Sequence, residues 1–287
     1  MKKIFQILIM TLIFFLLMAN KQVVNESVLH ACNLFIKSIF PSLFPILVFS
    51  NIYIYLNLAE YLNYIFFKIN KVLFKVDKYS SILFLMSIIS GNPSNAKIAL
   101  HFYDEGNLSS TNINKTLLFS NFCNPLFIYT FTKNKFFLVF ICHYIGNFII
   151  GFFLRNKYID KITNGFTRNK SKKIIIECIF DSINSAVYTL LFILGTIVTF
   201  YILINIFNIS FLSPIIELSQ GMNYINNLNI SLKLKTILFS GTLSFGGLCI
   251  HMQIFGILNK LKIKYYPYLL SRICHALITM ALVTILY

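Results

Sequence analysis

The sequence predicts an all-α polytopic membrane protein, and three observations lead to that fold class. Of the 287 residues, 57% are apolar and only 12% are charged, whereas soluble domains average about 45–50% apolar and about 25% charged residues. Several apolar stretches reach the ~20 residues that a membrane-spanning helix needs. The 25 basic residues outnumber the 9 acidic ones and lie between these stretches, as is typical of cytoplasmic loops. We therefore expect a lipid bilayer as the partner and no nucleic acid.

Seven stretches are apolar and long enough to be candidate spans. The first follows Lys2 and Lys3 and has no A-x-A cleavage site near Ala19, so we expect an uncleaved helix rather than a signal peptide. The second contains Pro41 and Pro45 and should kink or break there. The expected spans are residues 4–20, 28–57, 115–132, 135–154, 183–207, 236–258 and 268–287.

Three further segments do not fit a simple span. Residues 61–76 are basic and amphipathic, and are expected to lie along the membrane surface. Residues 80–90 are apolar but too short, and residues 211–225 contain a proline, a glutamate and a glycine. If 80–104 and 211–225 each enter and leave on one side, every Lys/Arg-rich loop falls in the cytoplasm, as the positive-inside rule requires. The sequence therefore predicts two re-entrant hairpins from opposite sides, a cytoplasmic N-terminus and an external C-terminus.

The predicted order of span, hairpin, span, span occurs twice with opposite orientation, which is the inverted-topology repeat of many secondary transporters. Two pairs of matching segments support a duplication: KTLLFS at 115–120 with KTILFS at 235–240, and ICH at 141–143 with ICH at 273–275. The expected parts of the chain are an N-terminal transmembrane helix (1–27), a first repeat (28–154), a basic cytoplasmic loop (155–173) and a second, inverted repeat (174–287).

Four polar stretches rich in helix-breaking residues occur at membrane depth. A helix interrupted inside a membrane is tolerated where it lines a cavity or is buried in protein. The helix that starts after the break offers free N–H groups and a partial positive charge, which suit a polar or anionic ligand. Gly and Ser also occur where membrane helices merely pack closely, but four such stretches at corresponding places favour a binding site. The expected contact residues are Ser90, Asn92, Ser94, Asn95, Lys97, Asn121, Asn124, Glu217, Ser219, Gln220, Ser244, Gly246, Gly247 and Gln253.

Ionisable residues within spans are costly in a bilayer and are therefore hypotheses for function. Glu217 could coordinate a solute or a coupling proton or cation, or it could lie at the membrane interface. Lys97 could meet an anionic group, or it could snorkel to the cytoplasmic surface as Arg272 could. No metal site or cofactor is expected, because no carboxylate or cysteine lies at ligand spacing from the histidines of the spans, His143, His251 and His275.

Three of the polar stretches resemble the motifs of one family. SGNPSNAK at 90–97 resembles S-G-x-P-x-G-A-K, and SNFCNPLFI at 120–128 resembles F-x-N-x-x-N/G-P-L-F-I. SFGGLCIHMQ at 244–253 resembles S-F-G-G-L-x-x-H-x-Q, and FPSLFP at 40–45 fits an early F-P-S-L-x-P stretch. In this order they resemble the YlbJ-like family of sporulation integral membrane proteins, within the nucleoside-recognition, or Gate, superfamily. Asn95 stands where the family usually has Gly, which weakens the expectation of a tight turn there.

The resemblance implies a fold related to that of concentrative nucleoside transporters and a role in moving dipicolinic acid into the developing spore. We therefore expect a transporter or facilitator of a small polar or anionic solute, with dipicolinate as the first candidate and a nucleoside as the second. One alternative is a non-transporting component of spore-envelope assembly, or a gate partner of another permease. Another is a metal-ion gate. An enzyme is not expected, because the chain contains no nucleophile elbow, zinc-protease motif or P-loop.

Overall fold

The computed structural model describes residues 2–157 and 174–287, so the predicted basic loop at 155–173 lies almost wholly outside the described residues. Every regular element in these two ranges is a helix, which confirms the predicted all-α fold. Five of the helical stretches are long and apolar enough to cross a membrane: Lys21–Tyr55, Pro125–Leu154, Ile175–Ile206, Leu232–Ile257 and Tyr265–Leu286. The chain is therefore a polytopic, multi-pass membrane protein.

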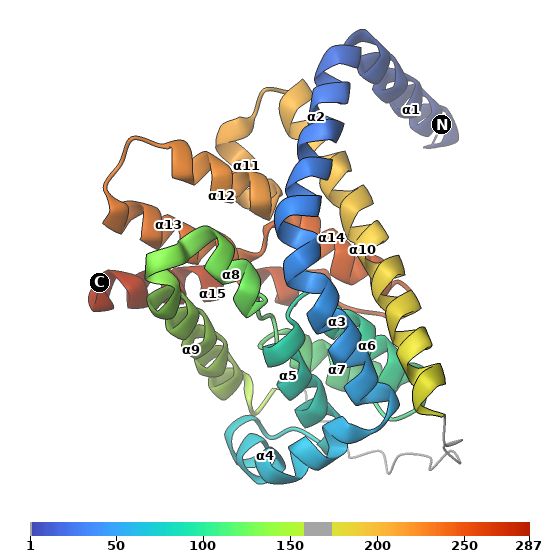
Figure 1. The fold of residues 1–287 in the computed structure, drawn as a ribbon, viewed down its shortest axis with the longest axis vertical. Helices are drawn as coiled ribbons and strands as arrows, with labels where there is room; N and C mark the ends of the chain where they lie inside the picture. Colours follow the sequence, from blue (N-terminus) through green and yellow to red (C-terminus); the bar gives the residue numbers. More distant parts are fainter. Residues whose placement is uncertain (1, 158–173) are drawn as a thin grey trace.

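The elements of the two halves follow one another as Figure 1 labels them. The first half contains α1 (Lys2–Ala19), α2 (Lys21–Leu34), the π-helix η1 (Phe35–Ile39), α3 (Phe40–Tyr55), α4 (Leu58–Phe74), α5 (Lys78–Ser90), α6 (Ser94–Asp104), α7 (Ser110–Leu117), α8 (Pro125–Thr132), η2 (Lys133–Lys135) and α9 (Phe136–Leu154). The second half contains α10 (Ile175–Ile206), η3 (Ser210–Leu212), α11 (Ser213–Ile216), α12 (Leu218–Asn227), α13 (Leu232–Phe245), α14 (Gly247–Ile257) and α15 (Tyr265–Leu286).

The two prolines of the second predicted span do not break it, although the helix is irregular beside them. α2, η1 and α3 form one continuous helical stretch, and the irregularity is the π-helix directly before Pro41, where the Phe40 N–H donates to the Phe35 carbonyl. In a regular α-helix the ring of Pro41 would crowd the carbonyl four residues earlier, that of Lys37. Lys37 lies within the wider π-helical turn, and such bulges accommodate local strain without ending a helix.

Equivalent elements of the two halves pack against each other. α10 packs along both α2 and α3 and runs in the opposite direction (Figure 1). α15 packs against α9, where the Nε2 atom of His275 lies 2.8 Å from the carbonyl oxygen of His143. Close packing there depends on Gly146, because a Cβ atom at this position would lie 2.7 Å from the His275 ring. The ICH segments that match in sequence thus meet in space.

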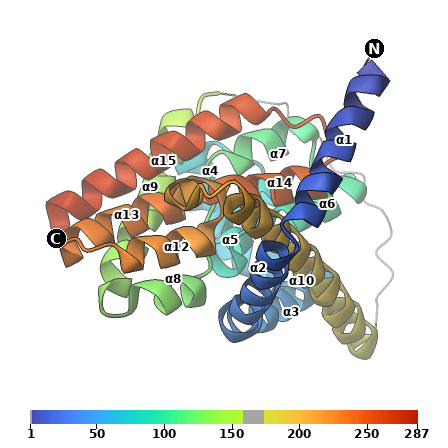
Figure 2. The ribbon, with the colours of Figure 1, turned by 90° about the horizontal axis from the view of Figure 1, so that it is seen from above.

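Both predicted hairpins are interrupted helices rather than single crossings. The first consists of α5 and α6, which pack together on either side of a turn at 91–93. The second consists of α11 and α12, which approach so closely that a Cβ atom on Gly221 would lie 2.4 Å from Pro214 Cα. In Figure 1 the α11–α12 hairpin lies in the upper part of the molecule and the α5–α6 hairpin in the lower part; Figure 2 shows the same elements from above.

The amphipathic segment predicted at 61–76 is α4, and its polarity is reversed relative to a soluble helix. Its exposed face carries large apolar side chains such as Tyr61, Tyr64 and Ile65, while Asn63 is buried. The Asn63 side-chain oxygen accepts a hydrogen bond from Ser81 Oγ on α5. Apolar groups outside and polar groups inside are expected of a helix that faces lipid rather than water.

Candidate solute-binding site

The tip of the first hairpin lies directly on the interrupted helix that follows it. The backbone N–H of Asn92 donates to the carbonyl of Phe122 at 2.9 Å. Gly91 has a φ of 68°, and a Cβ atom there would lie 2.7 Å from the backbone nitrogen of Asn124. Only glycine allows both this conformation and this approach. The break between α5 and α6 and the non-helical segment between α7 and α8 are therefore one packed unit.

The second repeat contains a corresponding contact, but here the glycine belongs to the interrupted helix and not to the hairpin tip. Gly247, at the break between α13 and α14, has a φ of 72°, and a Cβ atom there would lie 3.2 Å from the backbone nitrogen of Leu218. Leu218 begins α12, so the hairpin tip again rests on an interrupted helix. At Gly246 a Cβ atom would lie 3.8 Å from the side-chain nitrogen of Asn121. The breaks of the two repeats thus meet inside the protein.

One cavity lies where these segments converge. Its volume is small, about 50 Å³, and it is partly open to the surface. Five of the predicted contact residues line it, and they come from both repeats: Asn92, Asn124, Glu217, Ser219 and Gln253. The remaining wall is mostly apolar and comes from α3, the start of α8, α10 and α14, through Leu43, Phe127, Ile193, Ile197 and Ile250 among others.

The helices that follow the four breaks, α6, α8, α12 and α14, begin at or beside this cavity. Two of these beginnings are capped by lining side chains. The Asn124 side-chain oxygen accepts from the N–H of Leu126 at 2.8 Å, and the Glu217 carboxylate accepts from the N–H groups of Ser219 at 3.1 Å and Gln220 at 2.7 Å. No side chain caps α6 or α14. Two helix starts without a capping side chain and one carboxylate therefore lie at or beside a largely apolar cavity.

Asn92 leaves an acceptor unused beside the cavity. Its side-chain nitrogen donates to the side-chain oxygen of Asn121. Its own side-chain oxygen is buried and has no hydrogen-bond partner among the described residues. A buried polar atom without a partner is costly, and a ligand with a donor group would satisfy it.

Four predicted residues of the first repeat are buried around the break and do not line the cavity. Asn95 is fully buried within α6, and its side-chain nitrogen donates to the carbonyl of Ser120 at 2.9 Å. Asn95 does not form a tight turn, as the weakened expectation allowed, and the positive φ of this break is at Gly91. The Asn121 side-chain oxygen accepts from Asn92 and from the Tyr268 hydroxyl. Buried with them are the remaining two residues, Ser90 and Ser94.

Lys97 has neither of the two roles expected of it. Its ammonium group donates to the hydroxyl of Ser185 at 2.7 Å and to that of Thr189 at 2.6 Å, and also to the Ser185 carbonyl. All three acceptors belong to α10. Lys97 therefore joins the first hairpin to the long helix of the second repeat, rather than meeting a solute or snorkelling.

The other predicted residues of the second repeat also lie outside the cavity wall. The break expected over 240–247 is confined to Gly246 and Gly247, because α13 continues as a regular helix to Phe245. Ser244 is consequently helical, and its hydroxyl lies 2.9 Å from His143 Nδ1 and 3.0 Å from Thr279 Oγ1. Gln220 donates to the side-chain oxygen of Asn205.

The apolar wall residues were not predicted as part of the site. Ile193, Ile197 and Ile250 occur in apolar runs where nothing distinguishes a cavity-facing side chain from a lipid-facing one. Leu43 had a usable signal, since it lies within the FPSLFP stretch at 40–45.

The histidines of the spans do not contribute to the cavity wall, and no group of three or more His, Cys, Asp or Glu side chains within the described ranges could hold a metal ion. His143, for example, is fully buried between helices and accepts from the backbone N–H of Cys123 at 2.9 Å. A metal-ion gate would need at least one of these histidines in contact with the pathway, so the geometry gives that alternative no support.

Comparisons with known proteins give one informative match. No family model matches the chain, and no solved structure matches it. The chain is 24% identical over 302 aligned residues to the sporulation integral membrane protein YlbJ of Bacillus subtilis (strain 168), an alignment that covers 87% of this chain and 74% of the relative. The resemblance to the YlbJ-like family of sporulation integral membrane proteins, predicted from the three motifs, is thereby confirmed.

Proposed function

We propose that this protein is a transporter or facilitator that moves a small polar or anionic solute across a membrane during sporulation. The observation that carries the proposal is the cavity shared by the tips of both hairpins and the starts of both interrupted helices. Interrupting helices at membrane depth costs free energy unless the freed groups line a site. Sites at the interface of inverted repeats, built from discontinuous helices, are typical of secondary transporters.

The proposed mechanism is alternating access. The repeats touch along α10 with α2 and α3, and along α9 with α15. Rocking one repeat against the other along these two contacts opens the cavity first to one side and then to the other. Of the polar lining groups, Asn92 lies at the first hairpin tip, and Glu217 and Ser219 lie at the second. The solute stays between the two tips while the repeats move.

The lining groups suit a solute with carboxylate or amide-like groups. Asn92, Asn124, Ser219 and Gln253 offer donors and acceptors, and the helix starts favour negative charge. An ionised Glu217 would repel an anionic solute in the same cavity. We therefore propose that an anion enters together with a proton or a cation on Glu217. Dipicolinate is the first candidate solute and a nucleoside is the second. In the proposed topology the N-terminus lies in the cytoplasm.

The test is solute accumulation by the purified full chain in proteoliposomes, with dipicolinate and uridine compared. Asn124→Leu and Glu217→Ala should abolish uptake while the protein still inserts into the membrane. The matched control is Ser231→Ala, which removes the N-cap of α13, where Ser231 Oγ accepts from the Leu234 N–H outside the cavity. Cap removal costs about 1 kcal/mol at any of these helices, so the control separates loss of a cap from loss of the site.

Normal uptake by both cavity variants would refute the site. Absence of any flux from the unaltered protein would instead favour the non-transporting alternative, a component of spore-envelope assembly or a gate partner of another permease.

A further inference from the structure

Arg272 is a buried cation without an anionic partner. Its side chain is 0% exposed, so the snorkelling position considered for it is wrong. Among the described residues no acidic side chain forms an ion pair with it. Its contacts are with neutral acceptors and rings: the Leu118 carbonyl, the Ser271 hydroxyl, His275 Nδ1 and the face of the Tyr268 ring. The guanidinium charge is therefore uncompensated.

One donor of the guanidinium group is also unused. The Nε atom of Arg272 is buried and has no hydrogen-bond partner among the described residues. Capping the end of α7 does not require this charge, because the Leu118 carbonyl already accepts from the Ser271 hydroxyl. A buried charge is costly unless it is paired, so a purely structural role leaves both the charge and the free donor unexplained.

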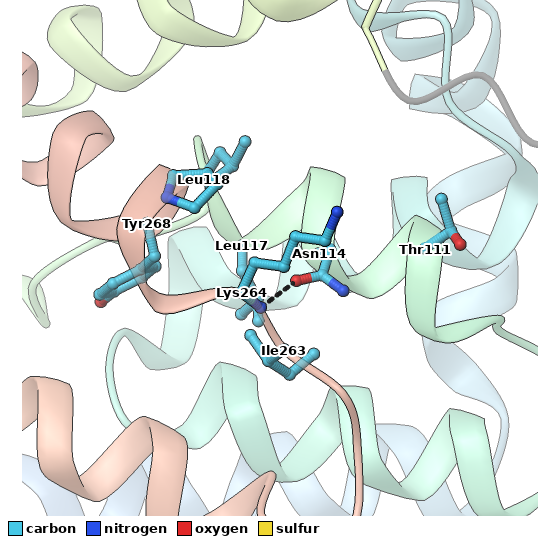
Figure 3. A pocket seen from close by; sticks show the side chains of 8 residues that line it. Thr111, Asn114, Leu117, Leu118, Ile263, Lys264 and Tyr268 are labelled. Carbon is cyan, nitrogen blue, oxygen red and sulfur yellow. Dashed lines mark hydrogen bonds between the residues drawn. The ribbon is translucent and has the colours of Figure 1, made fainter.

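A second cavity is lined by two of the residues that Arg272 contacts, Leu118 and Tyr268. It has a volume of about 80 Å³ and lies between α7 and the start of α15, beside the lysine-rich loop at 260–264. Figure 3 shows Asn114 at its centre, bonded through its side-chain oxygen to the backbone N–H of Lys264, with Leu118 and Tyr268 together on one side of that bond. We call this second cavity the vestibule. Because Arg272 contacts Leu118 and Tyr268, these two residues mark the end of the vestibule that is nearest Arg272.

Tyr268 also connects the vestibule to the central cavity. Its hydroxyl donates to the side-chain oxygen of Asn121 at 3.2 Å, and the same oxygen accepts from Asn92. Asn92 lines the central cavity. Tyr268, Asn121 and Asn92 thus form a hydrogen-bonded chain from a residue that lines the second cavity to one that lines the first.

We propose that Arg272 is the specificity-determining residue for an anionic, carboxylate-bearing solute, which it binds at the inner end of the vestibule when Tyr268 swings aside. This inference rests on the proposed transport function and adds the residue that selects an anion. A carboxylate there takes hydrogen bonds from the free Nε–H and from the Tyr268 hydroxyl, and it neutralises the guanidinium charge. The solute then passes to the central cavity.

The test uses two ligands of the same shape, pyridine-2,6-dicarboxylate and its neutral diamide. Binding to the purified full chain is measured as ligand-dependent thermal stabilisation, which reports the dissociation constant. We expect the dicarboxylate to bind on the order of 30-fold more tightly than the diamide, since losing one partner of a buried charge pair has effects of this size. Arg272→Gln should remove that difference, and Arg272→Lys should retain part of it.

Comparing the two ligands on the unaltered protein tests the proposal even if the variants fail to fold. Equal binding of the two ligands, or equal effects of the Lys and Gln variants, would overturn it. If uridine accumulates in proteoliposomes and the dicarboxylate does not bind, Arg272 is not an anion selector but the transport function stands. If no solute accumulates or binds, both proposals fall together.

Discussion

Replacing Gly91 with alanine should destabilise the protein far more than a typical glycine substitution. Gly91 has φ 68° and ψ −168°, a region that is essentially restricted to glycine and costs other residues about 1–3 kcal/mol. The new Cβ atom would also lie 2.7 Å from the Asn124 nitrogen and 3.1 Å from its Cα. These are backbone atoms that cannot rotate away, and overpacking of this kind costs about 1–3 kcal/mol. Together the two effects should lower the free energy of unfolding by about 2–6 kcal/mol.

The matched control is Gly106→Ala. Gly106 also has a positive φ, 74°, but a Cβ atom there would meet nothing within 4 Å. Its cost should be limited to backbone strain, about 1–2 kcal/mol. Thermal unfolding of both variants in detergent, together with solute uptake, compares them. If the two variants were equally stable, the first hairpin tip would not be packed on the interrupted helix, and the reasoning about the site would be wrong.

Two further substitutions test other contacts of the same framework. Gly247→Ala should lower the melting temperature more than Gly246→Ala. Both glycines have a positive φ, but only at Gly247 would the new Cβ atom press on the α11–α12 backbone, at 3.2 Å from Leu218 N. Equal melting temperatures would contradict the close approach of Gly247 to this hairpin. Lys97→Met should lower the free energy of unfolding by about 1–3 kcal/mol, because it removes the hydrogen bonds from the ammonium group to α10. The dissociation constant for solute in a binding titration should stay unchanged. A weaker affinity without a loss of stability would return Lys97 to the site.

The positions of the helix breaks could be predicted from sequence more reliably than their extents. Gly91-Asn92-Pro93 and the run around Glu217 contain residues that end helices for local steric reasons, and both breaks occur where expected. The stretch at 240–247 contains as many small residues, but α13 runs through most of it. There, hydrogen bonds from Ser244 to neighbouring helices and the close packing of Gly241 on Met280 fit a continuous helix. Tertiary contacts decided which small residues break the chain.

The site was predictable to the extent that its residues are both polar and placed at a break. Asn92, Asn124, Glu217 and Ser219 satisfy both conditions and line the cavity. Lys97 satisfies them as well, yet its long side chain reaches α10; the direction of a flexible side chain depends on which helix packs beside it. The apolar wall and the burial of Arg272 follow from packing between distant segments, so no local pattern contains them.

The orientation of the two hairpins is the central claim, and cysteine accessibility in sealed vesicles tests it most directly. In a background without the six native cysteines, Asp104→Cys reports the loop after the first hairpin and Asn229→Cys the loop after the second; both positions are exposed. An impermeant thiol reagent outside intact cells or right-side-out vesicles should label Asn229→Cys but not Asp104→Cys, and should label both after permeabilisation. Labelling of both positions from the same side would mean that the hairpins do not enter from opposite faces, and would contradict the account of an inverted repeat around one shared cavity.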